Sequence, residues 1–280
     1  MSAPAAGVSS SPPSRAGRNL PVAVGVGVAL ALVVLGTLYT VKATFVVVVA
    51  LATAIAVHEL ATSVRSAGVQ VPTVLLVAGN VVILVAAYVD GPDTLAAAFV
   101  LTVLAVAVAR LGHGPQGLTR DLSVAVFIVT WVSLLAAFAM VMLAEPDGPD
   151  RNVVFILAVV LSDTGGYLAG VLFGRHRMAP RVSPKKSWEG LVGSILLATA
   201  GTALVMPLLL DTPAWQGALF GAVVVVTATL GDLGESLVKR DLGVKDMGRL
   251  LPEHGGLMDR LDSLLPTAPV AAVLFVALLP

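Results

Sequence analysis

Cysteine is absent from this chain of 280 residues, and charged residues are scarce. Without cysteine, disulfides and thiolate metal sites are excluded, and thiol content says nothing about the redox compartment. Charged residues make up 12% of the chain, about half the share of a typical soluble domain, whereas hydrophobic residues make up 57%. The formal net charge is zero, so bulk electrostatics predict no nucleic-acid partner.

Long hydrophobic runs are abundant instead, and each approaches the roughly 20 residues that span the hydrocarbon core as a helix. Strand-like alternation is not seen, and lipid cannot satisfy bare backbone groups, so a barrel is disfavoured and helices are expected. We predict an all-α, polytopic integral membrane protein with about nine transmembrane helices. The runs cover residues 20–39, 42–60, 70–89, 94–111, 122–144, 152–173, 190–210, 214–231 and 264–280.

The first residues are small, polar and proline-rich, and they bury too little apolar surface to fold alone. A cleaved signal peptide is the competing interpretation, but the following run is about 20 residues long and further apolar runs come after it. Three regions are therefore predicted. They are a disordered tail over 1–19, five N-terminal spans over 20–150, and a C-terminal catalytic membrane region over 151–280.

Positive charges predict the orientation of the helices, because Lys and Arg favour cytoplasmic loops. With the N-terminus inside, 15 of the 17 Lys and Arg residues fall on the cytoplasmic side or its boundary; Lys42 and Arg151 do not. This predicts an N-in, C-out arrangement. Two cytoplasmic connections, 174–189 and 231–263, then hold 18 of the 34 formal charges in 49 residues. Chemistry is expected in these two connections.

The second connection begins with a stretch that reads as a helix at the membrane–water boundary. Asp232, Ser236 and Lys239 would share one face of this helix, with Glu235 as the alternative middle member. A carboxylate there can bind a hard cation, and Lys239 with Arg240 can hold phosphate. A solvated helix end with ion pairs four residues apart is the structural alternative.

A second acidic helix is predicted near the end of this connection. Asp259 and Asp262 lie three residues apart, so one helix face offers several oxygen ligands. Gly255 and Gly256 precede them where N–H groups suit an anion, and missing side chains let a phosphate approach. His254 is interpreted as a hydrogen-bond donor to phosphate, as an acid–base group or as a turn residue. Together the two acidic helices would serve a pair of magnesium-like ions.

The first connection contains adjacent lysines, Lys185 and Lys186, which attract anionic lipid heads or nucleotide phosphates at an interface. Alternatively, these lysines serve only as the positive charges that keep this connection on the cytoplasmic side of the membrane. Pro184 favours an extended backbone just before the next helix, and Ser187 is expected to cap the N-terminus of that helix.

An acidic residue also lies inside an apolar run. Asp163 falls near the middle of the sixth run, where insertion costs roughly 2.5–3.5 kcal/mol, so it is expected to line a polar cavity. Neighbouring glycines are expected to pack closely against another helix. His58 and Glu59, at the end of the second run, are interpreted as boundary residues.

Residues 236–262 resemble the signature of phosphatidate cytidylyltransferases (CDP-diacylglycerol synthases). SLVKR, KDMG and LPEHGGLMDRLD follow one another with every fixed residue present over 27 positions. Residues 163–174 and 183–190 also resemble that family's pattern, in the same order. Gly166 and Ser187 stand where the family usually has alanine and threonine, and the first 150 residues match only in hydropathy.

The resemblance implies that the cytidylyl group of CTP is transferred to phosphatidic acid, giving CDP-diacylglycerol and pyrophosphate for phospholipid biosynthesis. It implies a magnesium requirement with two metal ions, the second of which can be a different cation. Asp232 and Asp259 would be the metal ligands. A multi-pass protein of the inner membrane with a cytoplasmic active site is expected, in a lipid bilayer and often as a homodimer.

The predicted site residues fall into two groups. The catalytic group is Asp232, Asp259, Lys239, Arg240, Asp246, His254 and Asp262. The substrate-binding group is Asp163, Tyr167, Ser183, Lys185, Lys186, Ser236, Lys245, Gly255, Gly256 and Arg260.

Two other classes of function compete with this interpretation. A secondary transporter would also place ionisable residues inside spans, but it would need internal repeats or a broken mid-membrane helix pair. No repeat is seen, and the clustering of charges in two cytoplasmic connections suits chemistry on a soluble nucleotide better. The second competing class is a membrane enzyme that acts on another lipid phosphate, or a lipid kinase.

Overall fold

The computed structural model describes residues 20–112, 114–248 and 256–279, and these are mostly helical. The predicted all-α class is confirmed, with one short β-hairpin as an addition. The helices are α1 (Leu20–Thr40), α2 (Lys42–Ser66), α3 (Thr73–Val89), α4 (Pro92–Leu111), α5 (Leu118–Ile128), the π-helix η1 (Val129–Leu134), α6 (Leu135–Ala144), α7 (Gly148–Phe173), α8 (Trp188–Leu210), α9 (Ala214–Asp241), α10 (Met258–Leu261) and α11 (Leu264–Leu278).

Every predicted apolar run appears as a helix or as helices in series. Within the described ranges, seven helical segments are long and apolar enough to cross a membrane: α2, α4, α5–η1–α6, α7, α8, α9 and α10–α11. Two further apolar helices are shorter, namely α3 and residues Gly27–Thr40 of α1. A polytopic α-helical membrane protein is therefore confirmed, whereas nine spans stay a prediction.

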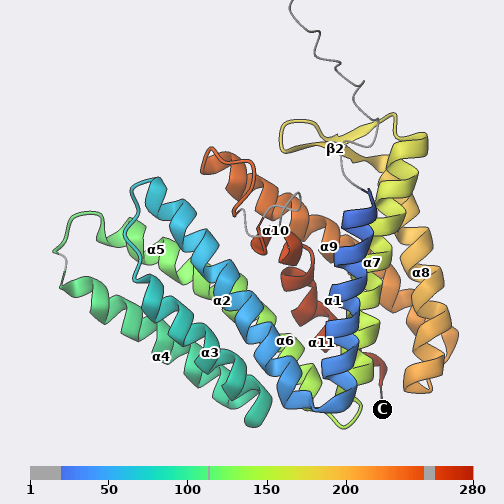
Figure 1. Ribbon diagram of the computed structural model, residues 1–280, viewed down its shortest axis with the longest axis horizontal. Coiled ribbons are helices and arrows are strands. Elements are labelled where there is room, and N and C mark those ends of the chain that lie inside the picture. The colour runs from blue at the N-terminus through green and yellow to red at the C-terminus, as the bar shows by residue number, and fades with distance from the viewer. Residues whose placement is uncertain (1–19, 113, 249–255, 280) are drawn as a thin grey trace, which may run out of the picture.

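Helices α7 and α8 lie side by side (Figure 1). Their backbones touch at Gly165 and Gly193, where a Cβ on Gly193 would lie 2.6 Å from the Gly165 carbonyl oxygen. A Cβ on Gly166 would likewise lie 2.6 Å from Ser194 Oγ. Small residues of this kind allow helices to approach closely in a membrane. The glycines at this contact therefore have the packing role expected from the sequence. The close contact fixes one wall of the site described below.

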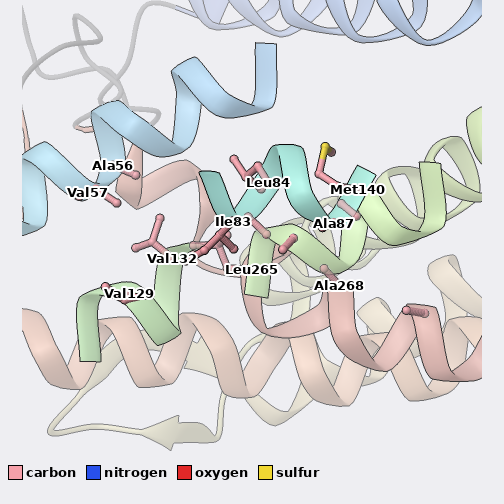
Figure 2. Close-up of a cluster of buried hydrophobic side chains, with 14 of the residues drawn as sticks. Ala56, Val57, Ile83, Leu84, Ala87, Val129, Val132, Met140, Leu265 and Ala268 are labelled. Atoms are coloured by element: carbon pink, nitrogen blue, oxygen red, sulfur yellow. The ribbon is translucent and has the colours of Figure 1, made fainter. Parts of the chain in front are cut away.

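A cluster of buried apolar side chains joins the N-terminal helices to α11. Figure 2 shows Ala56 and Val57 of α2 in this cluster, together with Leu265 of α11. Ile83 and Leu84 of α3 are fully buried within it. Because α11 follows the predicted acidic helix directly, this core ties the second polar connection to the N-terminal helices.

The first polar connection folds into an antiparallel hairpin of β1 (Arg177–Ala179) and β2 (Ser183–Ser187), which was not predicted. Arg177 donates a hydrogen bond to the Pro184 carbonyl across it. The extended conformation expected at Pro184 is therefore part of a strand. Ser187 Oγ accepts the Gly190 N–H at 3.1 Å, which confirms the predicted cap of α8.

Helix α9 continues ten residues beyond the predicted end of its apolar run and ends at Asp241. The residues predicted to share a helix face thus lie on the same helix as the preceding span. The C-terminal end of α9 and the hairpin lie in the upper part of Figure 1, with α10 below them, whereas the connections after α1 and α6 lie at its lower edge. The two polar connections therefore meet at one end of the helical bundle.

Candidate active site

A cavity of about 360 Å³ lies where α7, β2, α8, α9 and α10 meet. Four carboxylates and three cationic side chains from the predicted set line it, so segments distant in sequence converge there. The predicted residues on its wall are Asp163, Tyr167, Ser183, Lys185, Lys186, Asp232, Asp259, Arg260 and Asp262. Asp232 and Asp259 thus face a common hollow, which the predicted chemistry requires; their roles stay predictions.

An ion pair crosses the cavity between β2 and α9. Lys186 Nζ lies 2.7 Å from Asp232 Oδ2, and the two side chains are 22% and 30% exposed. Lys186 also donates to the Thr229 carbonyl at 3.3 Å, and Ser236 Oγ donates to Asp232 Oδ1 at 3.4 Å. Since neither charge is fully buried, both remain accessible to a polar ligand.

Asp259 is more enclosed, with 8% of its side chain exposed. Its Oδ1 lies 3.0 Å from Lys239 Nζ, and its Oδ2 accepts the Gly256 N–H at 2.8 Å and the Met247 N–H at 3.1 Å. Three donors therefore hold this carboxylate in a single orientation. Charge-assisted hydrogen bonds of this kind are the stronger class.

This arrangement differs from two expectations about phosphate binding. The Gly256 N–H was predicted to face an anion from substrate, but it is engaged by Asp259. Lys239 was predicted to neutralise phosphate, but it lies between Asp259 and Glu235, 3.5 Å from Glu235 Oε1, and outside the described lining of the cavity. The reason is that Asp259, near the start of α10, accepts hydrogen bonds from the backbone at Gly256 and Met247 and from Lys239, so these donors are already engaged.

Asp262 and Glu235 extend the acidic wall below Asp259. Asp262 lines the cavity, and its Oδ1 accepts the Ser263 N–H at 2.7 Å. Glu235 is 1% exposed, is not among the described residues that line the cavity, and has Lys239 as its cationic neighbour. The cavity lining therefore carries one more carboxylate than cationic side chains, so positive and negative groups are nearly balanced across it.

Asp163 lines the cavity from α7, as its position inside an apolar run predicted. Ser194 Oγ on α8 donates a hydrogen bond at 2.6 Å to the carbonyl of Ser162, the residue before Asp163 on α7. This bond joins the two helices beside Asp163. Tyr167 stands one turn further along α7 and is exposed at the cavity edge.

Some predicted residues lie elsewhere. Arg240 is exposed and donates to the Val182 carbonyl beside the hairpin at 3.4 Å. Lys245 and Asp246 are exposed and are not among the described residues that line the cavity. His254 and Gly255 fall outside the described residues.

The carboxylate oxygens in the cavity suit a hard cation whose remaining ligands come from a phosphate. In the described part of the chain, no three carboxylate or histidine side chains are grouped closely enough to form a complete metal site. Mg²⁺ is usually held by one or two carboxylates together with substrate phosphates and water, so a complete protein cage is not required. Asp232 and Asp259 fit that requirement, because both present carboxylate oxygens to the same cavity.

Sequence reasoning missed the contribution of α2. Glu59, interpreted as a boundary residue, is 8% exposed and accepts the Met258 N–H at 2.9 Å. Ser63 donates to the Met247 carbonyl at 3.2 Å. A carboxylate at the end of a long apolar run was the available signal. Its partner, 199 residues away, could not be read from the sequence.

Comparison with known proteins gives a consistent set of relatives. The Cytidylyltransferase family matches residues 22–278. A phosphatidate cytidylyltransferase of Mycobacterium leprae is 43% identical over 273 residues, covering 92% of this chain and 88% of the relative. One from Mycobacterium bovis is 41% identical over 280 residues, covering 95% and 91%. One from Brucella suis is 43% identical over 125 residues, covering 44% and 46%.

Proposed function

The chain belongs to the Cytidylyltransferase family, and we propose that it transfers the cytidylyl group of CTP to phosphatidic acid, giving CDP-diacylglycerol and pyrophosphate for phospholipid biosynthesis. Relatives named phosphatidate cytidylyltransferase, similar over more than nine-tenths of the chain, support this activity. The observation that carries the proposal is the cavity that brings Asp232, Asp259 and the lysines of β2 together at one end of the bundle.

The reaction joins two anions, so its main obstacle is electrostatic repulsion. An oxygen of the phosphatidate headgroup attacks the α-phosphorus of CTP, and the bond from that phosphorus to the pyrophosphate oxygen breaks. Because the attacking oxygen is already ionised, no strong general base is needed. Catalysis then depends on positioning and charge neutralisation. Lys185, Lys186 and Arg260 bring positive charge to the cavity wall for this purpose.

Asp232 and Asp259 would hold magnesium, with two ions in the site and the second open to another cation. A bound divalent ion would neutralise the negative charge of the phosphate groups in the transition state. Lys186 orients Asp232 through their ion pair, and Lys239 with two backbone N–H groups orients Asp259. Lys185 and Lys186 would receive the lipid phosphate.

We place the cavity on the cytoplasmic face of the inner membrane, in a nine-span, N-in and C-out arrangement. The distribution of Lys and Arg supports this orientation, as does the gathering of both polar connections at one end of the bundle (Figure 1). Dissolved CTP and membrane-embedded phosphatidate could then meet at the boundary between water and lipid. A homodimer is part of the same proposal.

The test is an assay of the full-length protein in phosphatidate vesicles with CTP labelled at the α-phosphate, with and without Mg²⁺. Labelled lipid that forms with one pyrophosphate per turnover, and only with Mg²⁺, is expected. Label transferred to the lipid from γ-labelled CTP would indicate a lipid kinase instead. Labelling of a polyprenyl phosphate in place of phosphatidate would move the activity to another lipid phosphate.

Asp163→Ala is expected to lower transfer about tenfold or more, because a carboxylate on the cavity wall would no longer position the reacting groups. The amount of protein in the membrane fraction should not change. Thr164→Val is the matched control on α7, since Thr164 Oγ1 bonds its own helix at the Val160 carbonyl. Initial rates per amount of membrane protein check this, and unchanged turnover in Asp163→Ala would contradict it.

A further inference from the structure

The contacts between α2 and the chain around Asp259 point to a function for the N-terminal half. We propose that Glu59, assisted by Ser63, is a positioning residue that fixes the backbone holding the Asp259 carboxylate. This inference rests on the proposed function, because Asp259 is assigned there to the reaction. It deepens that function by connecting the N-terminal helices to the reacting centre. The sequence motifs alone had left those helices with a resemblance in hydropathy only, whereas the family match begins at residue 22.

Glu59 makes the first contact. Its Oε2 accepts the Met258 N–H at 2.9 Å, at the residue before Asp259 in the chain. The side chain is buried on a helix whose preceding residues, Ala56 and Val57, pack into the apolar core (Figure 2). A close-packed core transmits displacement rather than absorbing it. Glu59 therefore offers Met258 a fixed acceptor.

Ser63 makes the second contact from the same helix face, since residues four apart on a helix are neighbours. Its Oγ donates to the Met247 carbonyl at 3.2 Å. The N–H of Met247 in turn donates to Asp259 Oδ2 at 3.1 Å. One turn of α2 thus holds the chain at Met247 and at Met258, on both sides of the Asp259 carboxylate.

Glycines around Glu59 allow this contact. A Cβ on Gly256 would lie 2.6 Å from Glu59 Oε2, and a Cβ on Gly248 would overlap Glu59 Oε1. Both positions therefore exclude any side chain while the carboxylate occupies its place. Gly256 is also the residue whose N–H donates to Asp259 at 2.8 Å. The carboxylate of Glu59 lies against the same backbone that holds Asp259.

Glu59 acts through the backbone rather than on substrate. It is not among the described residues lining the cavity, whereas Asp259 is. Moving the Met258 backbone would shift the Asp259 carboxylate, and misplacement by about 1 Å can cost on the order of 100-fold in rate. A merely structural role for Glu59 would instead reduce stability without a specific effect on turnover.

The experiment compares Glu59→Ala, Glu59→Gln and the control Thr53→Val in the phosphatidate vesicle assay. Gln keeps a carbonyl oxygen that can accept the Met258 N–H, whereas Ala removes the acceptor. Thr53 is a buried polar residue on the same helix whose partner, Asn80 Nδ2 at 2.9 Å, lies on α3 away from the cavity. Hydrogen exchange of a peptide containing Met258 is measured on the same samples, together with Tm.

Glu59→Ala is expected to lower kcat about 10- to 100-fold, with KM for CTP within about threefold of wild type and faster exchange at Met258. Glu59→Gln should recover most of the rate. Thr53→Val should lower Tm without changing kcat. A normal rate in Glu59→Ala, a rate lost together with Tm at unchanged exchange, or no recovery in Glu59→Gln would overturn the proposal. Absence of transfer in wild type would instead refute the proposed function, while the exchange measurement would still report on Glu59.

Discussion

Asp259→Asn should abolish measurable cytidylyl transfer, with a loss on the order of 10³-fold in kcat. The substitution preserves the size of the side chain but removes its negative charge and one of its two acceptor oxygens. The amide oxygen could still accept the Met247 and Gly256 N–H groups, which already share one carboxylate oxygen, but the amide NH2 group would then face Lys239 in place of its closest anionic partner. A proposed magnesium ligand would be lost as well.

The measurement is the initial rate of labelled lipid formation at saturating CTP across a range of Mg²⁺ concentrations. Asp241→Asn is the matched control, because it makes the same chemical change at an exposed residue at the end of α9. That control should keep the wild-type rate. A wild-type rate and magnesium response in Asp259→Asn would show that Asp259 is not a ligand and that the negative charge is dispensable.

Asp232→Asn is expected to produce the second large effect, a loss of about 10²- to 10³-fold together with a higher Mg²⁺ requirement. Asp232 is more exposed than Asp259 and has a charged partner in Lys186, 2.7 Å away. Removing its charge would weaken metal binding and would also free Lys186 from the position it holds across the cavity. Both consequences act at the same place, so the rate should fall steeply.

A double-mutant cycle separates these two consequences. Lys186→Met alone should lower the rate by removing a cation, and the double variant with Asp232→Asn should lose less than the product of the two single losses, because the pair is in direct contact. Rates and half-maximal Mg²⁺ concentrations for the four proteins are the data required. Independent effects, or an unchanged magnesium response in Asp232→Asn, would refute the role assigned to this pair.

Much of the fold could be predicted because runs of about 20 apolar residues have few structural alternatives in a membrane. The ends of the helices were less predictable. Helix α9 carries its polar signature to Asp241 on one continuous helix, although its hydrophobic run ends near residue 231. The hairpin of β1 and β2 was missed because three- and five-residue strands give too short a pattern for alternation to be recognised.

The candidate site shows the same division between local and long-range information. Asp163 could be placed in a cavity because an isolated carboxylate in an apolar run needs a polar environment. The capping role of Ser187 was equally local. The pairing of Lys239 with Asp259, and of Glu59 with Met258, depends on how distant helices pack. A single sequence contains no signal for such pairs.

The crossing of α7 and α8 has a mechanical consequence for substrate choice. At Gly165 and Gly193 the main chains themselves are in contact, so no rotamer change can widen or narrow that wall. Asp163 precedes Gly165 by two residues on α7, so its backbone is held at a fixed distance from α8. Any adjustment to headgroups of different bulk must therefore come from elsewhere in the cavity lining, where Lys186 and Asp232 are joined by a partly exposed ion pair that can rearrange.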